Sequence, residues 1–138
     1  MSIEESRYRP FEEASHSISH GIGALLSVVG TVLIWQKAHS MADWQQFAAA
    51  LLFGFSLILL YTCSACYHGS MVAKTKARWR KLDHAAIYVL IAGTYTPFTM
   101  ISMRDSWGFY LVLVIWAIAI AGVIMEFVAH LKFKKLSL

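Results

Sequence analysis

Four long apolar runs, separated by short polar stretches, dominate the sequence. The runs cover residues 20–35, 47–66, 85–101 and 108–129, and the second run contains no charged residue. Extended through residues 16–36, the first run reaches about 20 residues, which is the length that a helix needs to cross a hydrocarbon core of ~30 Å. We therefore predict an all-α polytopic membrane protein with four transmembrane helices.

Short polar segments join the predicted spans. Residues 37–46 form the first connector, and residues 69–81 form a basic loop that holds five Lys or Arg residues and no acid. Residues 102–107 form a tight turn. Pro97 lies near the far end of the third predicted span, where a break in the helix costs least.

Basic residues are distributed unevenly over these segments. With the N-terminus inside the cell, the inner segments hold ten of the twelve Lys and Arg residues, and the outer connectors hold only Lys37 and Arg104. Lys and Arg in short loops favour the cytoplasmic side, so we predict that both termini are cytoplasmic. The chain then divides into a cytoplasmic N-terminal segment (1–15), a four-helix transmembrane domain (16–131) and a basic cytoplasmic tail (132–138).

Composition supports the membrane interpretation. Hydrophobic residues make up 58% of the 138 residues and charged residues only 14%. A soluble domain of this size could not bury so much apolar side chain. The net charge of +4 would suggest nucleic acid as the partner of a soluble protein. In a membrane protein it marks cytoplasmic loops that attract anionic lipid. We expect membrane lipids as partners and no nucleic acid, and we leave a homo-oligomer open.

The predicted orientation brings chemically capable side chains to one side of the membrane. Ser64 and His68 lie four residues apart, on one face of the second predicted helix. Asp83 follows the basic loop, at the start of the third. An imidazole and a carboxylate on rigid helices suit a metal site, whereas polar groups at helix ends can also simply reach interfacial water. Five of the six histidines are expected on this cytoplasmic side: His16, His20, His68, His84 and His130.

Several segments in order resemble the hemolysin III family of bacterial membrane proteins, within the broader progestin and adipoQ receptor superfamily. Residues 13–21, EASHSISHG, resemble the family's E-x-x-N-x-x-x-H motif, with His16 where Asn is usual. Residues 64–68, SACYH, match its S-x-x-x-H motif, and residues 82–88 and 92–98 resemble its third-helix signature. The resemblance extends from residue 12 onward.

This resemblance implies a seven-helix fold with a zinc site near the cytoplasmic face. The site takes one histidine from the second span and two from an H-x-x-x-H motif in the last span, while an aspartate of the third span holds a water. By resemblance, His68 is the zinc ligand, Asp83 the water-holding catalytic carboxylate and Ser64 a neighbouring polar group. The implied activity is zinc-dependent hydrolysis of a lipid or an amide at the bacterial inner membrane.

The sequence matches only the N-terminal four spans of that family, and the closing H-x-x-x-H motif is not among them. Because His68 alone cannot retain zinc against water and chelators, we expect this chain by itself to bind zinc weakly and to lack hydrolase activity. Tight binding would require further ligands from a second copy or from His16, His20, His84 or His130. The alternatives are a pore-forming or membrane-perturbing protein and an inactive fragment.

Overall fold

The computed structural model describes residues 10–40 and 43–136, with side chains through Val128. These residues form four long α-helices and one short π-helical segment: α1 (Pro10–Ser40), α2 (Trp44–Gly69), α3 (Ala73–Pro97), η1 (Phe98–Ser102) and α4 (Gly108–Leu136). Four helical stretches are long and apolar enough to cross a membrane. The predicted all-α polytopic membrane class is therefore confirmed.

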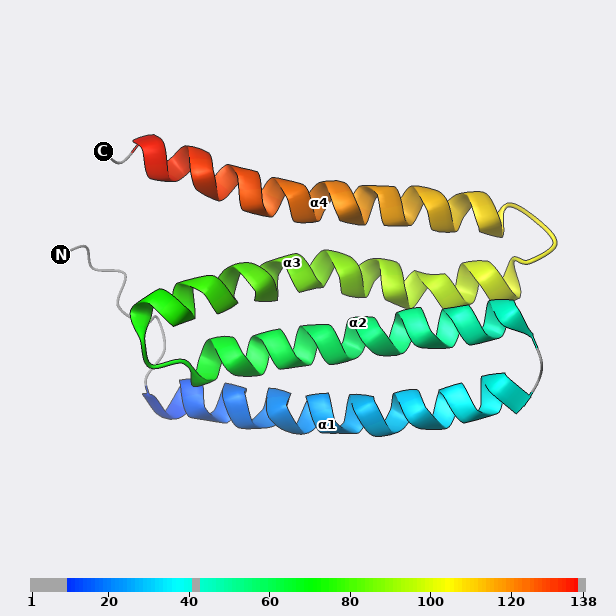
Figure 1. Ribbon diagram of the computed structural model, residues 1–138, viewed down its shortest axis with the longest axis horizontal. Helices are drawn as coiled ribbons and strands as arrows, with labels where there is room; N and C mark the ends of the chain where they lie inside the picture. The colour runs from blue at the N-terminus through cyan, green and yellow to red at the C-terminus, as the bar shows by residue number, and fades with distance from the viewer. Residues whose placement is uncertain (1–9, 41–42, 137–138) are drawn as a thin grey trace.

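The helices form an antiparallel row in which each packs against its neighbours in sequence (Figure 1). Helix α1 packs on α2, α2 on α3 and α3 on α4, and within the described ranges α1 and α4 do not approach each other. The start of α1 and the end of α4 lie at the same end of the row. The four helices thus make an open layer, and the outer faces of α1 and α4 remain uncovered by the described chain.

Small residues allow the helices to approach closely. A Cβ atom placed on Gly54 of α2 would lie 2.3 Å from Cγ2 of Thr31 on α1, and one on Gly93 of α3 would lie 2.1 Å from Oγ of Ser56 on α2. Ser56 is fully buried. Contacts of this kind are typical of helix packing in lipid, where close backbone approach replaces the hydrophobic driving force.

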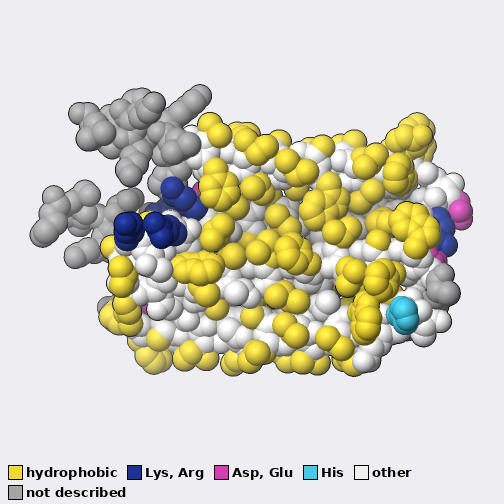
Figure 2. Space-filling view, viewed as in Figure 1, with side chains coloured by type: hydrophobic (Ala, Val, Ile, Leu, Met, Phe, Trp, Pro, Cys, Tyr) yellow, Lys and Arg dark blue, Asp and Glu magenta, His cyan; other side chains and the backbone are white. Residues whose placement is uncertain are grey.

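The basic segment predicted as a loop over residues 69–81 is largely helical, and that prediction was wrong. Helix α3 begins at Ala73, so the α2–α3 connection is reduced to residues 70–72. Alanine, lysine and arginine are good helix formers, and their long basic side chains can extend to the polar interface from a helix. On the face shown in Figure 2, Lys and Arg side chains gather mainly at the end of the molecule where α3 begins.

At the opposite end of the row, the first connector is also shorter than predicted. Helix α1 continues to Ser40, and Asp43 caps the N-terminus of α2 by accepting hydrogen bonds from the backbone N–H groups of Gln45 and Gln46, at 3.0 and 3.4 Å. The Arg104 guanidinium pairs with the Asp43 carboxylate and so joins this connector to the α4 turn.

The end of α3 agrees with the expected effect of proline. Helix α3 ends at Pro97 and continues as the π-helical segment η1, whose last turn is closed by a 3.2 Å hydrogen bond from Met103 N–H to the Phe98 carbonyl. The predicted tight turn follows, over residues 103–107. The predicted domain limits at residues 15 and 131 fall within α1 and α4, and residues 1–9 and 137–138 lie outside the described chain, so that division stays a prediction.

Candidate functional site

The first turns of α1 lie against the last turns of α2, because the two helices are antiparallel neighbours. Ser17 Oγ donates a 3.0 Å hydrogen bond to the Ala65 carbonyl. A Cβ atom on Gly69 would lie 2.9 Å from Ser17 Oγ, so glycine allows this close approach. Ring contact between His20 and Tyr61, with centroids 5.8 Å apart, extends the same seam toward the middle of the helices. These contacts fix which side chains face each other at this end.

Three histidines meet at this seam. The ring centroids of His16 and His68 are 5.0 Å apart, those of His20 and His68 are 6.0 Å apart, and those of His16 and His20 are 6.4 Å apart. The expectation that histidines gather at one end is confirmed for these three. His84 instead contacts α4, with Nδ1 at 3.3 Å from Glu126 Oε1. The side chain of His130 lies outside those described.

A buried carboxylate supports the cluster. Glu13 is 8% exposed. Its Oε2 atom lies 3.0 Å from His68 Nδ1, and its Oε1 atom lies 2.9 Å from Nζ of Lys76 on α3. Lys76 also lies over the Tyr67 ring, 5.4 Å from its centroid. Glu13 therefore links three helices through its two oxygens.

The role of Glu13 was not predicted from the sequence, where this residue belonged only to a motif and to the N-terminal segment. A usable signal was nevertheless present. Glu13, His16 and His20 occupy positions i, i+3 and i+7 of one helix, so they share a face. Because α1 begins at Pro10, this face exists as a helical surface from the first turn onward.

The two predicted catalytic residues lie in the same region of the fold. Ser64 is buried on α2, one helical turn before His68. Asp83 is partly buried on α3, and its carboxylate lies within electrostatic range of His20 and of the buried Cys63. Their catalytic roles, like that of His68 as a metal ligand, stay predictions.

The donor set fits zinc in chemical type, since imidazole nitrogen and carboxylate oxygen are its usual protein ligands. His20 Nδ1 is buried and has no hydrogen-bond partner among the described residues. In the described part of the chain, however, no group of three or more His, Cys, Asp or Glu side chains is placed so that it could hold a metal ion. The described residues therefore match zinc in the type of donor atom and not in a complete ligand set.

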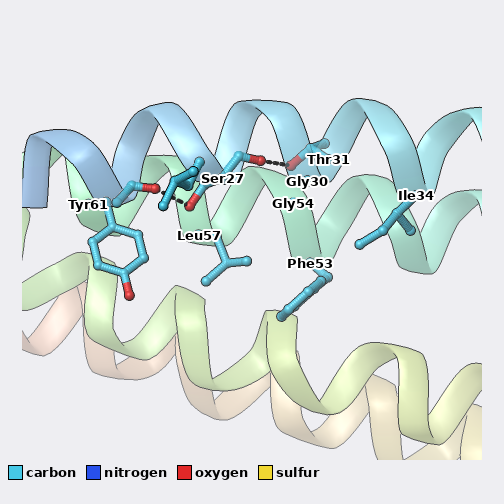
Figure 3. A pocket seen from close by; sticks show the side chains of 10 residues that line it. Ser27, Gly30, Thr31, Ile34, Phe53, Gly54, Leu57 and Tyr61 are labelled. Atoms are coloured by element: carbon cyan, nitrogen blue, oxygen red, sulfur yellow. Dashed lines mark hydrogen bonds between the residues drawn. The ribbon is translucent and has the colours of Figure 1, made fainter.

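An apolar groove adjoins the cluster, between α1 and α2 (Figure 3). It has a volume of about 310 Å³. Tyr61, which contacts His20, lies at one end, and Ile34 and Phe53 lie toward the other. Hydroxyl groups on the α1 side are satisfied by their own helix: Ser27 donates to the Gly23 carbonyl at 2.7 Å and Thr31 to the Ser27 carbonyl at 2.6 Å. The surface that lines the groove is therefore mainly apolar.

The fold and this polar end define a multi-pass helical membrane protein. Residues 8–138 match the model of the Haemolysin-III related family, and the chain belongs to that family. It is 38% identical to Hemolysin-3 of Bacillus cereus over 91% of the chain and 58% of that protein. It is also 38% identical to the Hemolysin-3 homolog of Bacillus subtilis, over 83% of the chain and 54% of that protein.

The chain also resembles an animal protein, at lower sequence identity. The chain is 27% identical to the human monocyte to macrophage differentiation factor over 96% of its own length and 57% of that protein. It thus spans little more than half the length of the curated relatives that it matches. No solved structure matches the chain.

Proposed function

We propose that this protein contributes the histidine-bearing site of a zinc-dependent membrane hydrolase that acts on the carbonyl of a lipid amide or ester. The observation that carries the proposal is the packing of three imidazoles from two helices, with centroids 5.0–6.4 Å apart, beside a buried carboxylate. Ionisable groups at membrane depth are expensive, and their concentration in one place favours a functional site over chance.

Each residue has a role that its chemistry suits. Bound zinc would supply Lewis acidity for the carbonyl and for a water molecule. His68 would be a metal ligand, held in orientation by its hydrogen bond to Glu13. The Asp83 carboxylate would orient the attacking water and accept its proton. Ser64, one turn from His68 on the same helix, would provide an orienting hydroxyl.

The neighbouring groove supports a lipid as the substrate. Its lining is mainly apolar, and it begins at Tyr61, which contacts His20 of the cluster. An acyl chain in this groove would place the head-group end of the lipid toward the histidines. Such a substrate would reach the site from within the membrane, so the carbonyl need not leave the bilayer.

The proposal is tested with the protein in vesicles that contain a fluorogenic N-acyl lipid or its ester analogue, with zinc supplied. The proposal differs here from the expectation from the sequence alone, which was that this chain lacks hydrolase activity: we expect hydrolysis, and a fall of about 100-fold or more in Asp83→Asn, the range for loss of a general base. The matched control is Asp105→Asn, in the exposed turn at the other end of the molecule. Equal rates for wild type, Asp83→Asn and protein-free vesicles would refute a hydrolase.

The name of the bacterial relatives suggests a second candidate function, because hemolysin denotes membrane lysis. The uncovered outer faces of α1 and α4 in the open row would allow copies of the chain to assemble side by side. Release of a trapped dye from the same vesicles without zinc, unchanged by Asp83→Asn, would favour this membrane-perturbing function. Absence of both hydrolysis and leakage would favour an inactive fragment.

A further inference from the structure

A second groove lies at the end of the molecule opposite the histidine cluster. It has a volume of about 680 Å³, within the range of about 300–1,000 Å³ that is usual for ligand pockets. One wall comes from the end of α1 and includes Ile34, and the other comes from the end of α3 and η1 and includes Phe98 and Ile101. Helix α2 supplies the floor with Ala49 and Ala50. Within the described ranges α1 and α3 do not contact each other, so the floor stays open between the walls.

The lining of this second groove suits an acyl chain. Ala49 and Ala50 are buried and small, so the floor leaves room between the walls. The wall side chains are large, apolar and half-exposed: Ile34 is 42%, Phe98 57% and Ile101 40% exposed. Part of one wall is π-helical, a feature that occurs frequently at functional sites. The groove therefore favours an apolar chain over a polar solute.

The second groove adjoins the groove beside the histidine cluster, because Ile34 and Phe53 line both (Figure 3). Along α2 the two grooves extend from Gln46 to Tyr61, a distance of about 22 Å at 1.5 Å per residue. One leaflet of a hydrocarbon core of ~30 Å is about 15 Å deep. A fatty acyl chain that enters at the second groove can therefore lie against the helices through the full depth of its leaflet.

The open end of the second groove lies where lipid head groups are expected. Trp35, near the end of α1, and Trp44, at the start of α2, are both exposed at this end of the row. Tryptophan is enriched at the membrane–water interface, where the ring lies at the level of the head groups. A lipid in the groove would thus have its head group beside the last turn of α1.

A cation is available at this position. Lys37 lines the groove, lies in the last turn of α1 and is exposed. Among the described residues no acid forms an ion pair with Lys37, whereas Arg104 at the same end is paired with Asp43. The Ser102 hydroxyl lines the groove from the opposite wall. An ammonium group and a hydroxyl suit the phosphate of a lipid, because a charge-assisted hydrogen bond is stronger than a neutral one.

From these observations we propose that the second groove binds one anionic glycerophospholipid, with its phosphate at Lys37 and Ser102 and an acyl chain between Ile34 and Phe98. A zwitterionic lipid suits the site less well, because its own head-group cation competes with Lys37 for the phosphate. The bound lipid would fill the space between α1 and α3 and so support two helices that do not contact each other. The site lies at the opposite end from the proposed hydrolytic site, and the inference depends neither on zinc nor on hydrolysis.

Photo-crosslinking tests this site directly. The full chain is placed in nanodiscs of phosphatidylcholine that contain a small fraction of phosphatidylglycerol with a diazirine on one acyl chain. After illumination, mass spectrometry locates the labelled residues. We expect label at Ile34, Phe53 or Phe98. Unlabelled phosphatidylglycerol should displace this label, whereas the same amount of further phosphatidylcholine should not.

Matched variants separate the charge from the shape of the groove. Lys37→Gln should weaken binding of phosphatidylglycerol about fivefold, the effect of one Lys near anionic lipid, and Lys37→Arg should restore it. Lys74→Gln removes the same charge from an exposed position at the other end and should have no effect on the groove label. Thr94 is exposed and lines the groove, so Thr94→Phe should fill the groove and abolish the label, whereas Thr94→Val should retain it. Helix content by circular dichroism and a single peak in gel filtration establish that each variant is folded.

Each outcome decides the question. Label that is absent from the groove, or spread evenly over the outer faces of α1 and α4, would overturn the inference, because the lipid would then be ordinary boundary lipid. Equal displacement by the two unlabelled lipids would overturn it too. The same would hold if Lys37→Gln and Lys74→Gln weakened binding equally, since any basic residue would then suffice. Normal groove label in a protein that hydrolyses no lipid would leave this inference standing and refute the proposed function instead.

Discussion

Buried hydroxyls show how single residues hold this fold together. Thr96 on α3 is fully buried and donates a 2.7 Å hydrogen bond to the Ala92 carbonyl of its own helix. The same oxygen accepts a 3.0 Å hydrogen bond from Trp116 Nε1 on α4. Lipid offers no water to satisfy the indole N–H, so this bond favours the pairing of α3 with α4.

We expect a measurable coupling between Thr96 and Trp116. Thr96→Val removes the acceptor and Trp116→Phe removes the donor, and the two together define a double-mutant cycle. Interhelical hydrogen bonds in membrane proteins contribute about 0.6 kcal/mol on average and rarely more than ~1.7 kcal/mol. Equilibrium unfolding in bicelles measures the four free energies of unfolding. A coupling free energy of zero would show that the bond adds nothing to helix association.

Asp43 should make stability depend on pH. Its hydrogen bond to Arg104, together with hydrogen bonds from the Gln45 and Gln46 backbone, holds its pKa below the usual value. The folded pKa therefore lies below the unfolded pKa, so the contribution is complete above the unfolded value, about 3.9, and is lost as the pH falls through the folded value.

The melting temperature of the wild type should consequently fall on acidification below about pH 4, by more than that of Arg104→Gln. The two proteins are compared by differential scanning fluorimetry in detergent. Because the pair is solvent-accessible, high salt should reduce the difference between them. Parallel pH profiles for the two proteins would show that Asp43 does not titrate with a shifted pKa.

The end of the row that holds the histidine cluster shows what the sequence could and could not predict about single residues. Topology alone predicted that His16, His20 and His68 would lie on the same side of the membrane, because their spans and orientation follow from hydropathy and charge. The Glu13–His68 pair was not predicted, because it depends on the rotation of α1 about its axis against α2. That rotation is set by small contacts such as Ser17 with Ala65, which no hydropathy pattern specifies.

At the scale of elements, the number and order of the helices followed from the lengths of the apolar runs. The ends of the helices did not follow from these lengths. A helix continues past an apolar run as long as its backbone hydrogen bonds can form and its residues have sufficient helix propensity. Lys76 illustrates the difference: hydropathy assigned it to a loop, whereas it lies in the first turns of α3 and bonds Glu13. The polar start of α1 at Pro10 escaped prediction for the same reason.

We expect helix pairing to be most sensitive to substitution of the glycines that contact a neighbouring helix. Gly54→Ala and Gly93→Ala each introduce a Cβ atom within 2.3 Å of a side chain on the adjacent helix. Overpacking of this kind costs typically 1–3 kcal/mol, so both variants should unfold at lower denaturant concentration. Gly30→Ala is the matched control, since a Cβ there has nothing within 4 Å. Equal stability of all three variants would contradict the close packing of α1–α2 and α2–α3.

At the scale of the whole molecule, the open row places most of the apolar surface on the outside. Few side chains are buried, and the buried ones are mostly small, whereas Leu25, Ile118 and many other large apolar side chains are exposed. Such a surface is unsuitable for water and well suited to lipid. The membrane therefore supplies the surroundings that a core would provide in a soluble protein, and the polar groups concentrate at the two ends of the row.

The two ends should lie on opposite sides of the membrane. Loop 70–72 and the start of α1 lie at one end of the row, and Asp43 and Arg104 lie at the other. Exposed basic side chains at the start of α3 favour the cytoplasm for the first end. Reporter fusions after Met71 should therefore read cytoplasmic, whereas fusions at Asp43 should read external.

Changing the positions of the basic residues tests whether they set the orientation of the protein. Replacing exposed Lys74, Arg78 and Arg80 by Gln, while keeping Lys76 for its bond to Glu13, should weaken the preference and give mixed reporter signals after Met71. Adding lysines beside Asp43 in the same variant should shift the signal further toward inversion. A cytoplasmic signal at Asp43 in the unmodified protein would refute the predicted orientation, and with it the placement of the histidine cluster at the cytoplasmic face.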